Sequence, residues 1–196
     1  MHPSAMAFAV DALGGECRGK TVLEAGAYDV NGSVGPHVRM TLGPAHYLST
    51  DMREGPGVDM VCAAEDLPAM LAALGDGAPL KWGADVVICM EMLEHAVDWQ
   101  AAMRGLIEVL APGGVLVLTT RSEGFPYHPY PEDYWRFSVG AMQRILAAAG
   151  LDVERCEQDP DPASPGVFAK ARKTEPWRMP DVSGAWDAAG VTGVAG

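Results

Sequence analysis

Three observations in the sequence predict an α/β fold, with a mostly parallel sheet and helices on both of its faces. Strand-like and helix-like segments alternate along the chain, which requires helical crossovers between parallel strands. The runs 86–88 and 115–118 are apolar without alternation, as expected for strands that are covered on both faces. An apolar strand also ends at Gly26. The turn that follows contains Gly32 and would let backbone N–H groups approach a ligand. We therefore expect a binding site at the carboxyl ends of the strands.

Seven segments have the composition of strands. The first five are expected to be parallel and lie at 21–25, 46–50, 58–62, 85–90 and 115–120. The last two of these should form the centre of the sheet, because they carry the longest apolar runs. Past Gly150, strands at 151–156 and 166–171 are separated by a Pro- and Asp-rich segment and are expected to form an antiparallel hairpin.

The expected helices carry apolar residues at helical spacing. One spans 4–13, and a short one follows the turn at Gly32. Three more are expected over 66–74, over 99–110 behind the N-cap Asp98, and over 139–149 behind the N-cap Ser138.

The composition suits one globular domain with a tail. The chain has 196 residues, of which 48% are hydrophobic and 20% charged, enough for a sizeable core. We expect a domain over 1–172 and a Pro-, Gly- and Ala-rich tail over 173–196. Trp177 and Trp186 are unusual in a free tail, so docking of part of it on the domain or on a partner stays open.

The acidic charge restricts the partners. A net charge of −12 argues against nucleic acid or an anionic membrane surface as the main partner, because both reward clustered Lys and Arg. No apolar run approaches the roughly 18 residues of a membrane span, and 5–10 lacks the basic flank of a signal peptide. We therefore expect a cytoplasmic protein. The four cysteines form no C-x-x-C pair and are expected to be buried thiols.

Four segments occur in an order that is typical of one enzyme family. They are VLEAG at 22–26, STD at 49–51, ICMEMLEH at 88–95 and LAPGGVL at 110–116. On these segments the chain resembles a class I S-adenosylmethionine-dependent methyltransferase over about residues 18–172. The resemblance implies a Rossmann-like seven-stranded sheet with an antiparallel last strand, S-adenosylmethionine as cofactor, and methyl transfer as the reaction.

The resemblance also implies which residues hold the cofactor. Asp51 would accept hydrogen bonds from the ribose hydroxyls, although it could instead cap a turn before Arg53. Glu24 would meet the methionine ammonium or only brace the loop, and the N–H groups after Gly26 would meet the carboxylate. The full predicted set is Glu24, Gly26, Tyr28, Gly32, Asp51, Glu65 and Met90.

The chain departs from the family pattern in two places. The usual Gly-x-Gly is replaced by AYDVNG at 27–32, which resembles a subgroup with the same Tyr-Asp-Val-Asn-Gly loop. The acid that often holds the adenine amino group after the third strand is missing, and 63–64 is Ala-Ala. Glu65 or Asp66 could substitute for it, or Asp66 could cap the next helix.

The acceptor end is expected to combine histidines with a stiff aromatic loop. His95 and His128 are the candidate catalytic residues, because imidazole titrates near neutral pH. His95 could equally cap the next helix. Tyr130, Tyr134 and Arg136 of the loop 124–137 are the candidate substrate residues, unless the loop aromatics only pack and Arg136 only pairs with an acid. No metal site is expected, since His128, Glu132 and Asp133 match no helical ligand spacing.

The predicted function is methyl transfer from S-adenosylmethionine to a small molecule. Oxygen is slightly preferred as the acceptor because a histidine is available to take a proton. The Asn/Asp-Pro-Pro-Tyr/Phe signature of amino-methylating enzymes is absent, and CMEM stands at 89–92 instead. The alternative is a methyltransferase-like module that is not catalytic and acts through a partner. The incomplete glycine fingerprint disfavours a dinucleotide oxidoreductase, and the oligomeric state stays open.

Overall fold

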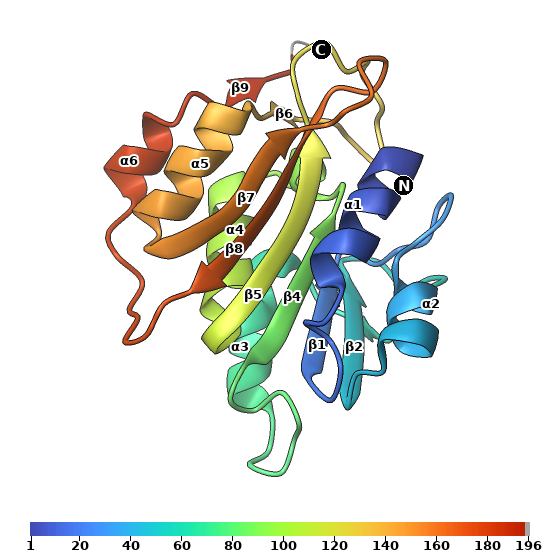
Figure 1. Ribbon diagram of the computed structural model, residues 1–196. Helices are drawn as coiled ribbons and strands as arrows, with labels where there is room; N and C mark the ends of the chain where they lie inside the picture. The colour runs from blue at the N-terminus through green and yellow to red at the C-terminus, as the bar shows by residue number, and fades with distance from the viewer. Residues whose placement is uncertain (195–196) are drawn as a thin grey trace.

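The computed structural model describes residues 1–194 and contains a seven-stranded sheet in the order β3-β2-β1-β4-β5-β8-β7 (Figure 1). Its strands are β1 (Thr21–Ala25), β2 (His46–Asp51), β3 (Met60–Val61), β4 (Ala84–Met90), β5 (Leu110–Arg121), β7 (Leu151–Gln158) and β8 (Gly166–Lys173). The strands β1 to β5 are parallel, and β8 is antiparallel to both β5 and β7. The predicted fold class is confirmed.

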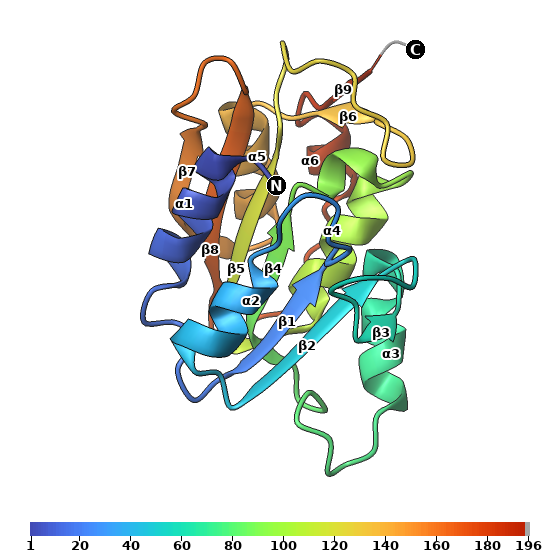
Figure 2. The ribbon, with the colours of Figure 1, turned by 90° about the vertical axis from the view of Figure 1, so that its right-hand side faces the viewer.

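Helices cover both faces of this sheet (Figures 1 and 2). One face carries α1 (Pro3–Leu13) and α2 (Gly35–His37), which continues as a π-helical turn over Val38–Leu42. The other face carries α3 (Leu67–Ala73), α4 (Trp99–Glu108) and α5 (Val139–Ala148), with the 3₁₀ helices η2 (Ala64–Asp66) and η3 (Leu93–His95). Within residues 1–194, no helix is long and apolar enough to cross a membrane.

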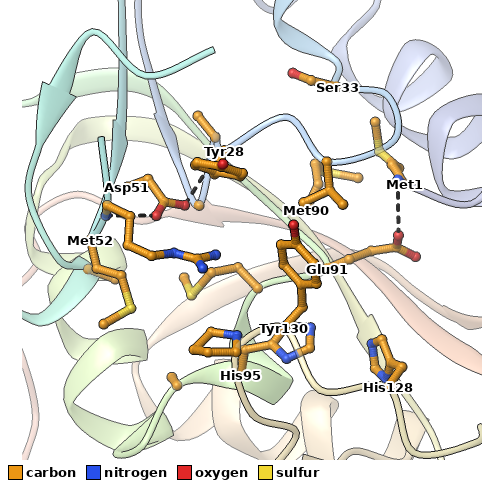
Figure 3. A pocket seen from close by; sticks show the side chains of 18 of the residues that line it. Met1, Tyr28, Ser33, Asp51, Met52, Met90, Glu91, His95, His128 and Tyr130 are labelled. Atoms are coloured by element: carbon orange, nitrogen blue, oxygen red, sulfur yellow. Dashed lines mark hydrogen bonds and ion pairs between the residues drawn. The ribbon is translucent and has the colours of Figure 1, made fainter. Parts of the chain in front are cut away.

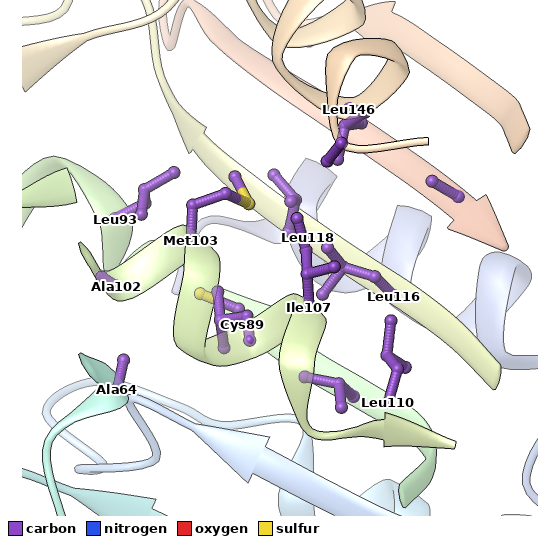
Figure 4. Close-up of a cluster of buried hydrophobic side chains, with 14 of the residues drawn as sticks. Ala64, Cys89, Leu93, Ala102, Met103, Ile107, Leu110, Leu116, Leu118 and Leu146 are labelled. Atoms are coloured by element: carbon purple, nitrogen blue, oxygen red, sulfur yellow. The ribbon is translucent and has the colours of Figure 1, made fainter. Parts of the chain in front are cut away.

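The side chains of β4 alternate between two separate cores. Val86 and Ile88 pack with α1, whereas Val87 and Cys89 pack with α4. Figure 4 shows Cys89 in this second core, next to residues of α4. All four are buried, which explains the continuous apolar run of a central parallel strand. Gly105 lets α4 approach η2 closely, because a Cβ atom there would lie 2.0 Å from the carbonyl oxygen of Ala64.

The predicted N-caps form, and several strand ends differ from the prediction. Asp98 accepts a hydrogen bond from the Ala101 N–H at 2.9 Å, and Ser138 accepts one from Ala141 at 3.1 Å. The helix α4 ends at Glu108, so Leu110 joins β5 and pairs with Ala84 instead of continuing the helix. The third strand is shorter than predicted and spans only Met60–Val61.

The segment after β8 packs onto the domain. It contains α6 (Ser183–Asp187) and β9 (Thr192–Gly193), which pairs with β6 (Trp135–Arg136) in a second sheet. The Trp186 side chain is 1% exposed, and its indole N–H donates to the Ile145 carbonyl at 3.0 Å. The Trp177 indole donates to Ala149 in the same way, at 2.8 Å. Of the two open alternatives, the structure shows docking on the domain.

Because Trp186 is part of the core, we expect Trp186→Ala to lower the free energy of unfolding by about 3–5 kcal/mol. The loss combines apolar transfer with a cavity beside the Trp99 ring, whose centroid lies 5.7 Å away. Urea unfolding followed by circular dichroism measures it. Trp82→Ala is the matched control, because Trp82 is 78% exposed. If Trp186→Ala lost no more free energy of unfolding than Trp82→Ala, the C-terminal segment would add nothing to the core.

Candidate active site

A cavity of about 780 Å³ opens at the carboxyl ends of β1, β2 and β4 (Figure 3). The structure brings all seven predicted cofactor residues to its wall: Glu24, Gly26, Tyr28, Gly32, Asp51, Glu65 and Met90. At the same cavity lie four of the five predicted catalytic and substrate residues, His95, His128, Tyr130 and Tyr134. The volume is within the usual range for small-molecule sites. We refer to this cavity as the cleft.

The loop after β1 is held against β2 by its backbone. The N–H groups of Gly26 and Ala27 donate to the Thr50 carbonyl at 2.9 and 3.0 Å. Gly26 has a φ of 77°, and a Cβ atom there would lie 2.5 Å from the Met92 side chain. Glycine is therefore required at this position both by conformation and by contact. The Gly32 N–H donates to Asp29 at 2.7 Å, which closes the turn.

Asp51, at the end of β2, performs the turn role and also lines the cleft. Its Oδ1 accepts the Arg53 N–H at 3.0 Å, and its Oδ2 accepts the Tyr28 N–H at 3.3 Å (Figure 3). The Arg53 guanidinium lies 4.9 Å from the ring centroid of Tyr28 and 5.4 Å from that of Tyr130. A carboxylate oxygen has two lone pairs, so these contacts leave Asp51 able to accept further hydrogen bonds.

Glu24 is a buried acid on the floor of the cleft. Its side chain is 3% exposed and accepts a hydrogen bond from the Tyr47 hydroxyl. Burial raises the pKa of Glu24 to about 8, and the positive charge of Arg39 only partly opposes this shift. Glu24 is therefore largely protonated near neutral pH when no ligand is bound.

This protonation predicts a pH-dependent stability. In the unfolded chain Glu24 titrates near its ordinary value of 4.5, so between about 4.5 and 8 only the folded state holds the proton. The contribution of Glu24 is fully present below about pH 4.5 and is lost as the pH rises through about 8, at up to about 1.4 kcal/mol per pH unit. Urea titrations of wild type and Glu24→Gln should therefore diverge over this window. A difference that does not vary with pH would contradict a protonated Glu24.

The two candidate catalytic histidines lie together at the other end of the cleft. Their ring centroids are 4.8 Å apart. The Nδ1 atom of His95 is 2.6 Å from the Glu132 carbonyl oxygen, and that of His128 is 2.8 Å from Asp133 Oδ2. The first contact joins His95 to the loop 124–137, which carries Tyr130 and Tyr134, and the second lies within that loop. His95 ends η3, and its side chain lines the cleft.

Arg136 does not line the cleft. Its side chain is buried, and its guanidinium donates to both carboxylate oxygens of Asp133 at 2.5 and 2.6 Å. Further hydrogen bonds run to the carbonyls of Phe125 and Pro126. Of the two alternatives for Arg136, the structure shows the pairing with an acid. Phe137 is likewise buried in the core.

The sequence prediction missed Glu91, which lines the cleft, and Glu94, which is buried outside the cleft wall. Glu91 lines the cleft with a φ of 51° and pairs with Arg121, and the N-terminal amine of Met1 lies 4.0 Å from its carboxylate (Figure 3). Glu94 lies beneath the two histidines, fully buried. Glu91 stands three residues before Glu94 in the segment 88–95. This pair of acids at the end of a strand was the sequence signal that could have found them.

A family model described as a methyltransferase domain matches residues 10–183 of this Rossmann-like chain, and the chain belongs to that family. The predicted class and the prediction of an enzyme are thereby confirmed.

Similar proteins agree with this assignment. Over 57 residues, 29% of this chain, the sequence is 46% identical to ubiquinone biosynthesis O-methyltransferases of Psychrobacter cryohalolentis and Psychrobacter arcticus. The match spans only 20% of those proteins.

Solved structures show the same fold at low identity. The 1,6-didemethyltoxoflavin-N1-methyltransferase of Burkholderia thailandensis, solved with S-adenosylhomocysteine, has a TM-score of 0.62 at 20% identity over 88% of this chain and 78% of its own. An S-adenosylmethionine-dependent methyltransferase of Mesorhizobium loti has a TM-score of 0.61 at 17% identity over 86% and 98%.

Proposed function

We propose that this protein transfers a methyl group from S-adenosylmethionine to the oxygen of a small molecule. The observation that carries the proposal is the cleft, where two acidic side chains at the ends of β1 and β2 face two histidines of η3 and the loop 124–137. The similar Burkholderia thailandensis structure, which was solved with S-adenosylhomocysteine, supports the choice of cofactor.

Residues at the β1 and β2 end would hold the cofactor. Asp51 has free acceptor capacity for the ribose hydroxyls, and Glu24 provides an acid for the methionine ammonium. Glu65 is exposed at the cleft, near the point where other family members place an acid for the adenine. The bound cofactor supplies an electrophilic methyl group on a sulfonium.

Residues at the opposite end would receive the acceptor. Tyr130 and Tyr134 give this end an aromatic wall, which suits a ring-bearing small molecule. When a hydroxyl attacks, its oxygen bonds to the methyl carbon as the sulfur–methyl bond breaks, and the hydroxyl proton must leave. His95 and His128 line the cleft at this point and are the groups that would accept the proton or polarise the hydroxyl. The partial match to O-methyltransferases supports oxygen as well.

Transfer from radiolabelled S-adenosylmethionine to matched pairs of acceptors tests the reaction. Each pair should share one aromatic ring and differ only in a hydroxyl or an amine, and mass spectrometry should locate the added methyl group. We expect labelled product from the hydroxyl compounds. Label on the amine compounds alone would refute the oxygen preference, and it would leave the methyltransferase assignment in place.

A further inference from the structure

Three side chains at the acceptor end of the cleft converge on one point. They are Glu94 and His95 of η3 and His128 of the loop 124–137, and one ligand atom of each lies within 4.8 Å of the other two. We propose that these three side chains bind a divalent transition-metal ion of the Zn²⁺ type. The sequence prediction of no metal site considered a different set, in which Glu132 and Asp133 were the ligands.

The carboxylate of Glu94 lacks a partner on one oxygen. The side chain is fully buried, and its Oε2 accepts a hydrogen bond from the Thr120 hydroxyl at 2.8 Å. Its Oε1 is buried and has no hydrogen-bond partner among residues 1–194. A buried carboxylate oxygen without a hydrogen-bond partner costs free energy, so the unpaired Oε1 of Glu94 needs an explanation. A cation beside Oε1 would provide one.

Both histidines point their free nitrogen at that oxygen. The Nε2 atoms of His95 and His128 lie 4.0 and 3.8 Å from Glu94 Oε1, which is too far for hydrogen bonds. In a tetrahedral zinc site with bonds of about 2.0–2.2 Å, neighbouring ligand atoms are about 3.3–3.6 Å apart. To share an ion, the two distances from Glu94 Oε1 would therefore shorten from 4.0 and 3.8 Å to about 3.3–3.6 Å. The ligand atoms of the three side chains already lie within 4.8 Å of one another.

The outer hydrogen bonds prepare the histidines for this role. The Nδ1 atoms face the Glu132 carbonyl and the Asp133 carboxylate, both of which only accept hydrogen bonds. Each Nδ1 therefore carries the ring proton, and each Nε2 presents its lone pair to the centre of the cluster. A carboxylate or carbonyl behind a histidine is the usual support of a metal-binding imidazole. Arg136 fixes the Asp133 carboxylate, which gives this buried arginine a positioning role.

The ligand set indicates the kind of metal. Two imidazoles and one carboxylate suit Zn²⁺ and other divalent transition metals better than Mg²⁺ or Ca²⁺, which prefer oxygen ligands. Three protein ligands leave a further coordination position, and since both histidines line the cleft, it would face the acceptor. That this open position faces a methyl acceptor rests on the proposed function. With both Nε2 lone pairs on the ion, the ion would polarise the acceptor hydroxyl in place of the histidines. It would lower the pKa of that hydroxyl, which favours methylation of oxygen.

Zinc binding by the untagged full chain tests the site. The protein would be stripped with a chelator and titrated with Zn²⁺ against a coloured competing chelator, and Co²⁺ would report the coordination geometry by its visible absorption. We expect one ion per chain. Glu94→Gln, His95→Gln and His128→Gln should each weaken Zn²⁺ binding by about 100-fold or more and remove the Co²⁺ band. His46→Gln is the matched control, because His46 is exposed at the start of β2, and it should bind as wild type does.

Three results would contradict the proposed metal site. They are wild type that does not bind one Zn²⁺ per chain, Zn²⁺ binding that all three ligand variants retain, and a loss of Zn²⁺ affinity in His46→Gln equal to that in the ligand variants. Circular dichroism of each variant would ensure that lost binding is not lost folding. Titration with S-adenosylhomocysteine separates this inference from the proposed function. Cofactor binding without Zn²⁺ binding would refute only the metal site, and Zn²⁺ binding without cofactor binding would support the metal site and refute only the proposed function.

Discussion

Asp51→Ala should weaken the binding of S-adenosylhomocysteine by about 10- to 150-fold. The carboxylate stands at the end of β2, lines the cleft and retains acceptor capacity beyond its bonds to the Arg53 and Tyr28 N–H groups. Losing hydrogen bonds to a charged acceptor costs about 1.5–3 kcal/mol, which is the free energy that corresponds to this range of affinity. Isothermal titration calorimetry of both proteins measures the loss directly.

Asp66→Ala is the control for this variant. Asp66 is an exposed acid in η2, close in sequence to the cleft residue Glu65, but it is not part of the cleft wall, and its side chain caps no helix. The control should therefore bind S-adenosylhomocysteine as wild type does. Equal affinity of Asp51→Ala and wild type would mean that Asp51 serves only the turn before Arg53 and that the ribose lies elsewhere.

The affinity of the wild type for S-adenosylhomocysteine should rise as the pH is raised from about 6 to about 8. Burial holds the pKa of Glu24 at about 8 in the free protein, so below that pH most molecules carry a protonated Glu24. The ligand ammonium favours the charged carboxylate, and binding must therefore expel the proton. The affinity then increases by up to about tenfold per pH unit until Glu24 is charged without the ligand. In Glu24→Gln this increase should disappear, and at about pH 8 the variant should bind about 10-fold or more weakly.

Glu65→Gln is the control for the pH dependence, because Glu65 is also an acid of the cleft but is exposed. Its affinity should keep the wild-type increase with pH, whatever its absolute value. An affinity that falls with pH in the wild type, or an increase that survives in Glu24→Gln, would show that Glu24 only braces the loop through Tyr47.

The main features of the fold followed from local sequence patterns. Apolar runs such as 86–88, caps such as Asp98, and a glycine after the first strand are each set by neighbours along the chain, and each formed as expected. Because the carboxyl ends of parallel strands meet at one edge, these patterns also placed Glu24 and Asp51 in one cleft.

The acceptor end was harder to predict, since it depends on contacts between distant segments. Arg136 is conspicuous in the sequence beside aromatic residues, yet tertiary packing turns it toward Asp133 and away from the cleft. Glu94 and His128 are brought together only by the path of the loop 124–137, and no spacing rule connects them. The same holds for Trp186, whose burial against α5 depends on where the segment after β8 returns.

The most direct test of the proposed function is a calorimetric titration of the purified chain with S-adenosylhomocysteine, with NAD as the negative control. The cleft predicts saturable binding of one S-adenosylhomocysteine per chain and no binding of NAD. A folded protein that binds no S-adenosylhomocysteine would contradict the cofactor assignment and favour a module that acts through a partner.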